Sequence, residues 1–193
     1  IPFASTLMGL SAMPNSHPNY VGYLGMHGNY GPNIKTNECD VLIAIGMRFD
    51  DRVTGDLKRY AKQAKVIHVE IDPAEIDKNV KTDVAIIGDA KDALSGLIPR
   101  VKQKSYPDWM AEVSACEKGE DRKVFAKDFA TDTEKVKMAE VIKMLSEKTK
   151  GEAITVSDVG QHQMIVSRYY HYQLPDSNVT SGGLGTMGFA LPA

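Results

Sequence analysis

A short apolar run that ends abruptly in a charged loop constrains the fold of this chain more than any other feature. Five consecutive apolar residues, Val41 to Ile45, are too few for a typical helix. They are typical of a strand that is buried on both faces of a parallel sheet. Gly46 then allows the backbone to turn sharply, and the charged side chains that follow in residues 47–55 are excluded from a core.

This charged loop lies where open parallel sheets bind ligands, just beyond the carboxyl end of a strand. The guanidinium groups of Arg48 and Arg52 are fork-shaped donors that suit a phosphate group. A simpler interpretation is a solvated loop in which the arginines pair with Asp50 and Asp51. The stretch by itself leaves both interpretations open.

Two further apolar runs predict an α/β fold with a doubly wound parallel sheet. Val66–Ile71 and Val84–Ile87 are predicted strands, and helical stretches alternate with them. A helix is expected after Val84–Ile87, and Pro99 should kink or end it. No Gly-x-Gly-x-x-Gly loop is present, so either phosphate is bound differently here or the glycine turn lies upstream of Ile1.

An acidic residue near the end of the predicted strand 66–71 is a candidate ligand. In dinucleotide-binding folds an acid at such a position hydrogen-bonds a ribose hydroxyl, which makes Glu70 a candidate for this role. Asp72, Pro73 and Glu75 follow, in a pattern typical of an N-cap and capping box at a helix start. Local structure therefore explains Asp72 and Glu75 without a ligand.

A second α/β unit is predicted after a charged stretch. An amphipathic helix begins at Pro107, and the mixed charges of residues 117–123 are most simply a solvated face. Apolar residues at positions 136, 139, 142 and 145 then predict another helix, and Ala153–Val156 a strand.

Two loops of this second unit have the features of an anion site. Asp158, Val159 and Gly160 lead into a helix from about Gln161, whose free N–H groups and positive dipole end would lie at the strand tip. The glycines of residues 182–185 permit close approach of a ligand to the backbone. An ordinary turn with a solvated His162 explains the same residues, and the sequence leaves that alternative open.

Four motifs, in this order, resemble acetohydroxyacid synthase (acetolactate synthase), large catalytic subunit. They are Gly25–Gly28, Gly46–Gly55, Ser157–Met164 and Ser181–Ala193. Members of that family use thiamine diphosphate with Mg²⁺ and a bound FAD. The resemblance covers nearly the whole chain and implies a central FAD-binding domain at residues 1–104. It also implies a connector at 105–134 and the first part of a thiamine-diphosphate-binding domain at 135–193.

The resemblance implies two sets of cofactor-binding residues. The expected flavin set is Leu7, Met8, Leu24, Gly25, Met26, His27, Gly46, Arg48, Asp50, Arg52, Val53, Glu70, Ile71, Glu75, Gly88 and Asp89. The expected thiamine set is Val159, Gly160, Gln161, His162, Gly185 and Met187, of which Met187 would support the bent conformation of thiamine diphosphate.

The family resemblance also implies an activity. The reaction is decarboxylation of pyruvate on thiamine diphosphate and condensation with a second 2-ketoacid, in branched-chain amino-acid biosynthesis. The family implies a cytoplasmic homodimer or higher homo-oligomer with a regulatory small subunit. Related enzymes of the pyruvate oxidase or glyoxylate carboligase type, and a non-catalytic nucleotide-binding module, stay as alternatives.

We expect the chain to be an inactive fragment of this enzyme. It begins at Ile1 without an initiator methionine and ends at Ala193 inside an apolar run. The catalytic glutamate and the Mg²⁺ ligands of the family would both lie outside it, so no catalytic residue and no metal ligand is assigned here. Ile165 stands where many members have a tryptophan, which puts the details of the substrate channel in doubt.

Composition excludes other classes of protein. A formal net charge of -2 without a basic run gives no support for nucleic-acid binding. No apolar run approaches the roughly 20 residues of a membrane helix, and no signal-peptide pattern opens the chain. Cys39 and Cys116 are isolated and have no metal-ligand spacing, which is typical of reduced thiols in a cytosolic protein.

Overall fold

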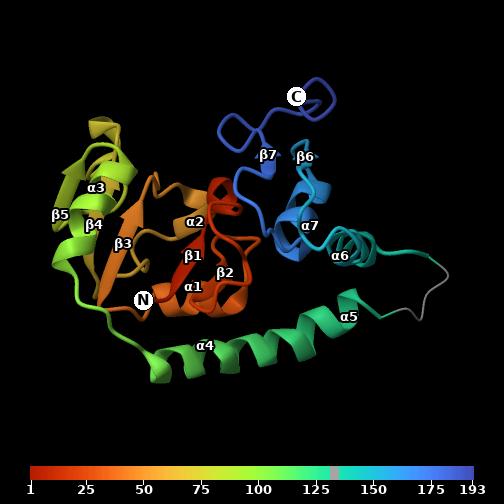
Figure 1. The fold of residues 1–193 in the computed structure, drawn as a ribbon, viewed down its shortest axis with the longest axis horizontal. Helices are drawn as coiled ribbons and strands as arrows, with labels where there is room; N and C mark the ends of the chain where they lie inside the picture. Colours follow the sequence, from red (N-terminus) through yellow and green to blue (C-terminus); the bar gives the residue numbers. More distant parts are fainter. Residues whose placement is uncertain (131–134) are drawn as a thin grey trace. The chain divides into compact units, whose positions relative to one another are not determined.

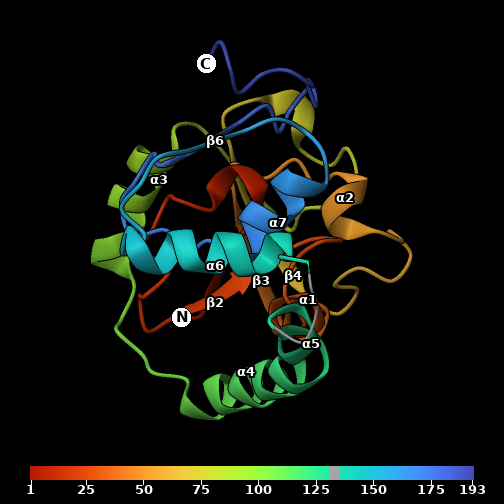
Figure 2. The same cartoon turned by 90° about the vertical axis from the view of Figure 1, so that its right-hand side faces the viewer.

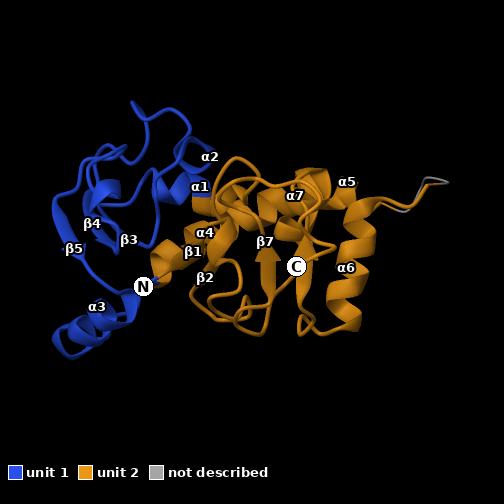
Figure 3. Ribbon diagram, turned by 90° about the horizontal axis from the view of Figure 1, so that it is seen from above, with its two compact units in different colours: residues 1, 33–106 blue, residues 2–32, 107–193 orange. Residues whose placement is uncertain are grey.

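The computed structural model of the chain describes residues 1–130 and 135–193, and these contain three separate parallel sheets (Figure 1). They divide into unit 1, which is Ile1 and residues 33–106, and unit 2, which is residues 2–32 and 107–193 (Figure 3). Both units combine parallel strands with helices, so the predicted α/β class is confirmed. The last residues of the expected connector, 131–134, lie outside the described residues.

Unit 1 is built on three neighbouring parallel strands, in the order β3 (Val41–Ile45), β4 (Lys65–Glu70) and β5 (Val84–Ile87). Its helical segments are α2 (Asp51–Thr54), η2 (Pro73–Glu75), α3 (Ala90–Leu97) and η3 (Ile98–Arg100), and α1 (Tyr30–Thr36) contains the boundary between the units. The predicted strands are confirmed, and α3 ends just before the turn that contains Pro99, as expected.

The two faces of the unit 1 sheet differ in burial, which corrects the prediction that Val41–Ile45 is buried on both faces. Successive side chains of a strand point to opposite faces. Ala44 lies in a core with Phe49 and Tyr60, and is 3% exposed. Val41, Ile43 and Ile45 point to the other face and are 46%, 42% and 41% exposed. The apolar run therefore identified the strand but not how much of it the chain covers.

Phe49 anchors the charged loop to this core. Its side chain is 2% exposed, and its ring centroid lies 5.0 Å from that of His68 and 6.2 Å from that of Tyr60, in edge-on geometry. Its φ of 53° is left-handed, a conformation that costs a non-glycine residue about 1–2 kcal/mol. Burying a phenylalanine side chain stabilises the fold by about 1.5–3 kcal/mol, which offsets this strain.

Unit 2 contains two pairs of parallel strands. β1 (Phe3–Ser5) pairs with β2 (Tyr20–Tyr23), and β6 (Thr155–Ser157) pairs with β7 (Asn178–Thr180). Its helical segments are η1 (Leu7–Gly9), α4 (Pro107–Glu120), the π-helical η4 (Asp121–Phe125), α5 (Ala126–Asp128), α6 (Met138–Lys148) and α7 (Gln161–Tyr169). Figure 2 shows α6 lying alongside α7, against which it packs. The predicted starts at Pro107 and Gln161 are confirmed, whereas the strand after α6 begins at Thr155 rather than Ala153.

A buried tyrosine cluster joins the N-terminal segment of unit 2 to its C-terminal segment. Leu10 and Tyr23 pack with Tyr170 and Tyr172, and Tyr172 is 0% exposed. The hydroxyl of Tyr172 lies 2.7 Å from Oγ1 of Thr155, so the cluster also fixes β6. Burial raises the pKa of the Tyr172 hydroxyl to about 12.

The apolar stripe predicted for α6 is only half correct. Ala139 and Ser146 are buried, and Ile142 packs against the tyrosine cluster. Leu145 and Val136 are 47% and 76% exposed. A spacing of three residues drifts around a helix of 3.6 residues per turn, so the buried face follows residues 139, 142 and 146 instead.

The division into units differs from the domain boundaries expected from the sequence. Residues 2–32 belong to the same unit as residues 107–193, and the tyrosine cluster joins the two segments. The expected boundaries at 104 and 134 stay a prediction.

We expect Phe49→Ala to lower the free energy of unfolding of unit 1 by about 3–5 kcal/mol, because it removes a buried ring and leaves a cavity against His68. Native-state hydrogen exchange of the β4 amides measures this change. Val41→Ala, at a 46% exposed position in the same sheet, is the control and should cost less than about 1 kcal/mol. Equal losses in the two variants would contradict the anchoring role of Phe49.

Candidate functional site

The exit loops of β3, β4 and β5 meet at one edge of the unit 1 sheet, because the three strands are parallel. The Gly46 amide donates to the Val69 carbonyl at 2.9 Å, and the Gly88 amide donates to the Glu70 carbonyl at 3.0 Å. Gly46 has a φ of 60°, as its predicted turn requires. The edge carries the unit 1 members of the expected flavin set: Gly46, Arg48, Asp50, Arg52, Val53, Glu70, Ile71, Glu75, Gly88 and Asp89.

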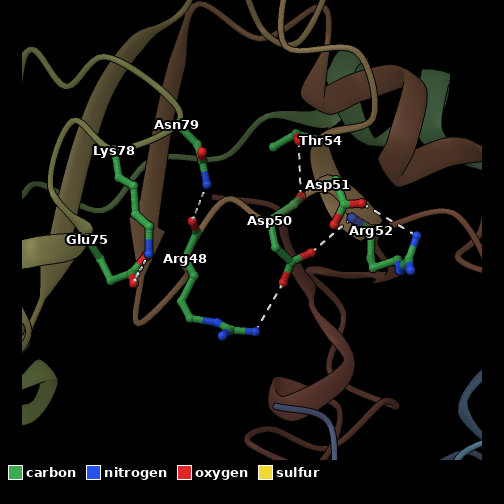
Figure 4. Close-up of polar contacts among 8 residues, drawn as sticks. All are labelled: Arg48, Asp50, Asp51, Arg52, Thr54, Glu75, Lys78 and Asn79. Atoms are coloured by element: carbon green, nitrogen blue, oxygen red, sulfur yellow. Dashed lines mark hydrogen bonds and ion pairs between the residues drawn. The ribbon is translucent and has the colours of Figure 1, made fainter. Parts of the chain in front are cut away.

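The two arginines of the loop after β3 make the ion pairs of the simpler interpretation (Figure 4). Nη2 of Arg48 lies 3.4 Å from Oδ2 of Asp50, and Nη1 of Arg52 lies 3.5 Å from Oδ2 of Asp51. The arginine side chains are 53% and 74% exposed. Exposed pairs of this length contribute about 0–1 kcal/mol, so an anionic ligand can compete with the aspartates for the guanidiniums.

Two aspartates of the flavin set also begin helices. Oδ1 of Asp50 accepts a hydrogen bond from the Arg52 amide at 3.0 Å, at the start of α2. Oδ1 of Asp89 accepts from the Lys91 amide at 2.8 Å, at the start of α3. Both residues therefore have a structural role that is independent of any ligand.

Glu70 is buried at the end of β4. Its Oε1 accepts hydrogen bonds from the amides of Ile71 at 2.9 Å and Asp72 at 3.2 Å, and its side chain is 8% exposed. Its Oε2 lies 3.9 Å from Nε2 of His68. Since Oε1 is occupied by the exit loop, Oε2 is the oxygen with capacity for a ligand hydroxyl.

Asp72 caps η2 as predicted, and its Oδ1 accepts from the Ala74 amide at 2.9 Å. The predicted capping box is wrong, because the Asp72 amide donates to Glu70 rather than to Glu75. Glu75 instead pairs with Nζ of Lys78 at 2.6 Å (Figure 4).

The sequence did not reveal the role of His68 and Phe49, two buried side chains that hold the loop after β3 in place. His68 is 0% exposed, and its Nε2 donates to the Met47 carbonyl at 2.8 Å. Its Nδ1 has no hydrogen-bond partner in the described part of the chain. A histidine within an apolar strand was the available signal, but its partner lies in another loop.

In unit 2, a second pair of exit loops leaves β6 and β7, which are also parallel. Ser157 and Thr180 are register partners, and Oγ of Ser157 donates to Oγ1 of Thr180 at 3.2 Å. Nε2 of Gln163 on α7 donates to the same hydroxyl at 2.8 Å. These contacts hold the start of α7 beside the end of β7, where the two loops that contain the expected thiamine residues begin.

The start of α7 has no side-chain cap. Gly160 precedes the helix with a φ of 155°, and a Cβ at this position would lie 2.8 Å from Cε1 of His162. The N-cap residue therefore offers no side-chain acceptor to the N–H groups of the first turn. That these groups bind an anion stays a prediction. Gln161 and His162 are exposed on this turn, and Met187 on the neighbouring loop is 80% exposed.

The remaining members of the flavin set lie in unit 2 as well. Nδ2 of Asn178 donates to the Leu7 carbonyl at 2.9 Å, and a Cβ on Gly182 would lie 2.4 Å from Sδ of Met8. The turn of Gly25–Gly28 is closed by a 2.9 Å hydrogen bond between its end residues. Leu24 before the turn is buried, whereas Met26 within it is 63% exposed. His27 is half-buried.

The expectation that residues 117–123 form a solvated face is wrong for Glu120. Its side chain is 4% exposed and pairs with Arg168 of α7. Both residues are functional candidates that the sequence did not reveal, because their contact joins segments far apart in the chain.

Residues 1–130 and 135–193 contain neither a candidate metal-binding cluster nor a candidate membrane-spanning helix. No group of three or more His, Cys, Asp or Glu side chains is arranged to hold a metal ion. No helix among the same residues has the length and apolar character needed to cross a membrane.

Comparison with known proteins identifies two family matches. Residues 1–97 match the family described as thiamine pyrophosphate enzyme, central domain, and residues 158–193 match thiamine pyrophosphate enzyme, C-terminal TPP binding domain. The central-domain match crosses the division between the two compact units.

Curated relatives match the whole chain. The acetolactate synthase isozyme 3 large subunit of Escherichia coli (strain K12) is 42% identical over 200 residues, and the acetolactate synthase large subunit of Lactococcus lactis is 44% identical over 194. Acetolactate synthase 1, chloroplastic, of Zea mays is 41% identical over 199 residues. The alignments cover 100% of this chain but 34%, 33% and 30% of these relatives, so the chain spans about a third of their length.

We expect Gly28→Ala to lower the free energy of unfolding of unit 2 by about 1–3 kcal/mol. An added Cβ would lie 2.2 Å from the Tyr23 carbonyl oxygen, so the turn of Gly25–Gly28 would have to open. Urea unfolding followed by fluorescence of Trp109, the single tryptophan, measures the change. Gly119→Ala in α4 is the control, because nothing lies within 4 Å of its added Cβ. It should stabilise the unit slightly. A stable Gly28→Ala protein would contradict the tight turn.

Proposed function

Because the chain belongs to the thiamine pyrophosphate enzymes, we propose that it is a segment of an acetolactate synthase large subunit. The full-length protein would decarboxylate pyruvate and join the product to a second 2-ketoacid, in branched-chain amino-acid biosynthesis. The observation that supports this proposal is the uncapped start of α7 beside the start of the glycine loop after β7, an arrangement that would suit a diphosphate group, in a chain with relatives of that name.

The residues around α7 suit thiamine diphosphate. The free N–H groups after Gly160 and the helix dipole stabilise negative charge at the strand tips. Thiamine diphosphate, when bound, supplies the electron sink for decarboxylation. The residues that would hold it are Val159, Gly160, Gln161, His162, Gly185 and Met187. The exposed apolar side chain of Met187 would support its bent conformation.

The edge of the unit 1 sheet suits the phosphates and ribose of FAD. Arg48 and Arg52 offer bidentate donors that are held only by long, exposed ion pairs. Glu70 has one carboxylate oxygen available for a ribose hydroxyl. The turn that contains Met26 and His27 would contact the flavin ring. We assign the Mg²⁺ ligands and the catalytic glutamate to parts of the full-length protein outside this chain.

The proposed enzyme has partners of three kinds. Its substrates are small 2-ketoacids. The full-length chain assembles as a homodimer or higher homo-oligomer in the cytoplasm. A regulatory small subunit joins it, as the large-subunit names of the relatives support.

The test of the proposed activity uses the full-length protein with pyruvate, FAD, Mg²⁺ and thiamine diphosphate. We expect acetolactate, detected as acetoin after acid treatment in a colorimetric assay. Reduction of the flavin on addition of pyruvate, without acetolactate, would instead favour an enzyme of the pyruvate oxidase type. The 193-residue chain alone should give no acetolactate above the cofactor-only background. Turnover by this chain would disprove the assignment of the catalytic glutamate elsewhere.

Arg48→Ala and Arg52→Ala in the full-length protein should each weaken FAD binding by roughly ten- to a hundredfold. Each removes a charge-assisted hydrogen bond worth about 1.5–3 kcal/mol. Neither side chain is in the core, so both variants should fold normally. Arg59→Ala, also at an exposed position of unit 1, is the matched control. If fluorescence titration gives all three variants the parental FAD affinity, the arginines serve only their aspartate pairs, and this loop is not a flavin site.

A further inference from the structure

A buried ion pair in unit 2 holds the turn of Gly25–Gly28 in place. Arg168 lies in the last turn of α7, and its Nη2 donates to Oε1 of Glu120, the last residue of α4. Its Nη1 donates to the carbonyl oxygens of His27 at 3.1 Å and Gly28 at 2.7 Å. The Arg168 and Glu120 side chains are 17% and 4% exposed. One guanidinium therefore joins a carboxylate to the two final carbonyls of the turn.

Glu120 holds the backbone that follows the turn. Its Oε2 accepts a hydrogen bond from the Tyr30 amide at 3.0 Å and from Nδ2 of Asn29 at 3.5 Å. Oδ1 of Asn29 accepts from the Tyr23 amide at 2.9 Å, on the other side of the turn. We call Arg168, Glu120 and Asn29 the turn clamp. It fixes carbonyls at the end of the turn and amides on both sides of it.

The clamp requires an arginine at position 168. The guanidinium carbon lies 5.4 Å from the centre of the Phe125 ring and 5.9 Å from that of the Tyr169 ring, within cation–π distance of both rings. A planar fork can bond two carbonyls and a carboxylate at the same time, whereas a lysine ammonium is a single point charge on a flexible stem.

We propose that Arg168, through the turn clamp, is the positioning residue for the flavin-contacting turn. This inference rests on the proposed function, which assigns Gly25, Met26 and His27 to FAD. The clamp binds the last two carbonyl groups of the turn to Arg168 of α7. Met26 stays on the surface of the turn and is 63% exposed. Arg168 itself is not expected to touch either cofactor.

The same helix has the proposed thiamine diphosphate site at its other end. Arg168 lies seven residues after Gln161, which is about 10 Å along a helix. Loss of the clamp should therefore alter flavin binding selectively, because the start of α7 is fixed separately by Gln163 and Thr180. A general structural defect would weaken binding of both cofactors.

The experiment compares Arg168→Met, Arg168→Lys and Glu120→Gln in the full-length protein. Arg122→Met is the matched control, because Arg122 is exposed and follows Glu120 closely. We expect Arg168→Met to weaken FAD binding at least tenfold in a fluorescence titration, with thiamine diphosphate affinity within twofold of the parent. The FAD affinity of Arg168→Lys should lie between those of Arg168→Met and the parent. Glu120→Gln should weaken FAD binding as much as Arg168→Met does, and the control variant should bind FAD as tightly as the parent.

Hydrogen exchange provides a readout that does not depend on cofactors. The amides of Gly28, Asn29 and Tyr30 are bonded in or beside the turn, so their exchange should accelerate in the clamp variants while amides of β6 and β7 stay unchanged. If Arg168→Met fails to fold, Arg168→Lys and Glu120→Gln decide the result. Unchanged exchange at these three amides would show that the clamp does not hold the turn.

The outcomes separate this proposal from the proposed function. If exchange accelerates but FAD affinity stays parental in a protein that forms acetolactate, the positioning role is wrong and the proposed function stands. If the parent binds no FAD and forms no acetolactate, the proposed function fails, and the flavin role of the clamp fails with it. Equal weakening of both cofactors would also overturn the selective role of Arg168.

Discussion

Parallel pairing of strands is the constraint on which the candidate site residues of each unit depend. Neighbouring parallel strands end at the same edge, so residues far apart in the sequence become adjacent. In unit 1 this edge gathers the loops that begin at Gly46, Ile71 and Gly88. In unit 2 it places the start of α7 beside the glycine loop after β7, through Ser157 and Thr180.

The loops at these edges are fixed by buried groups rather than by the charged residues that mark them. The exposed pairs of Arg48 and Arg52 contribute little to stability, which leaves those guanidiniums free to exchange partners. Phe49 holds the same loop through its buried ring. The buried pair of Arg168 and Glu120 is different, because loss of either partner would strand a charge away from water. In the roles that we propose, exposed charge serves binding and buried charge serves positioning.

The degree of burial differs between the surfaces of each unit. The sheet of unit 1 has a core on one face, around Phe49, whereas Val41, Ile43 and Ile45 on the opposite face are 41–46% exposed. In unit 2 the tyrosine cluster packs Leu10 and Tyr23, near the start of the chain, against Tyr170 and Tyr172 near its end. The family match over residues 1–97 and the compact units of this chain therefore divide the sequence at different positions.

The sequence by itself determined the local elements and the chemistry of the loops. Short apolar runs identified β3, β4 and β5, and Asp72 and Gly46 marked a cap and a turn. The order of four motifs identified the family, because those patterns depend on neighbours in the chain, whereas the cofactor-binding residue sets that the resemblance implies stay predictions. Tertiary structure decided the rest. One face of β3 is exposed, the Asp72 amide donates its hydrogen bond to Glu70, and Glu120 is buried against Arg168. These outcomes depend on which distant segments meet, and a charged residue in a polar run shows the same local pattern whether it is solvated or paired.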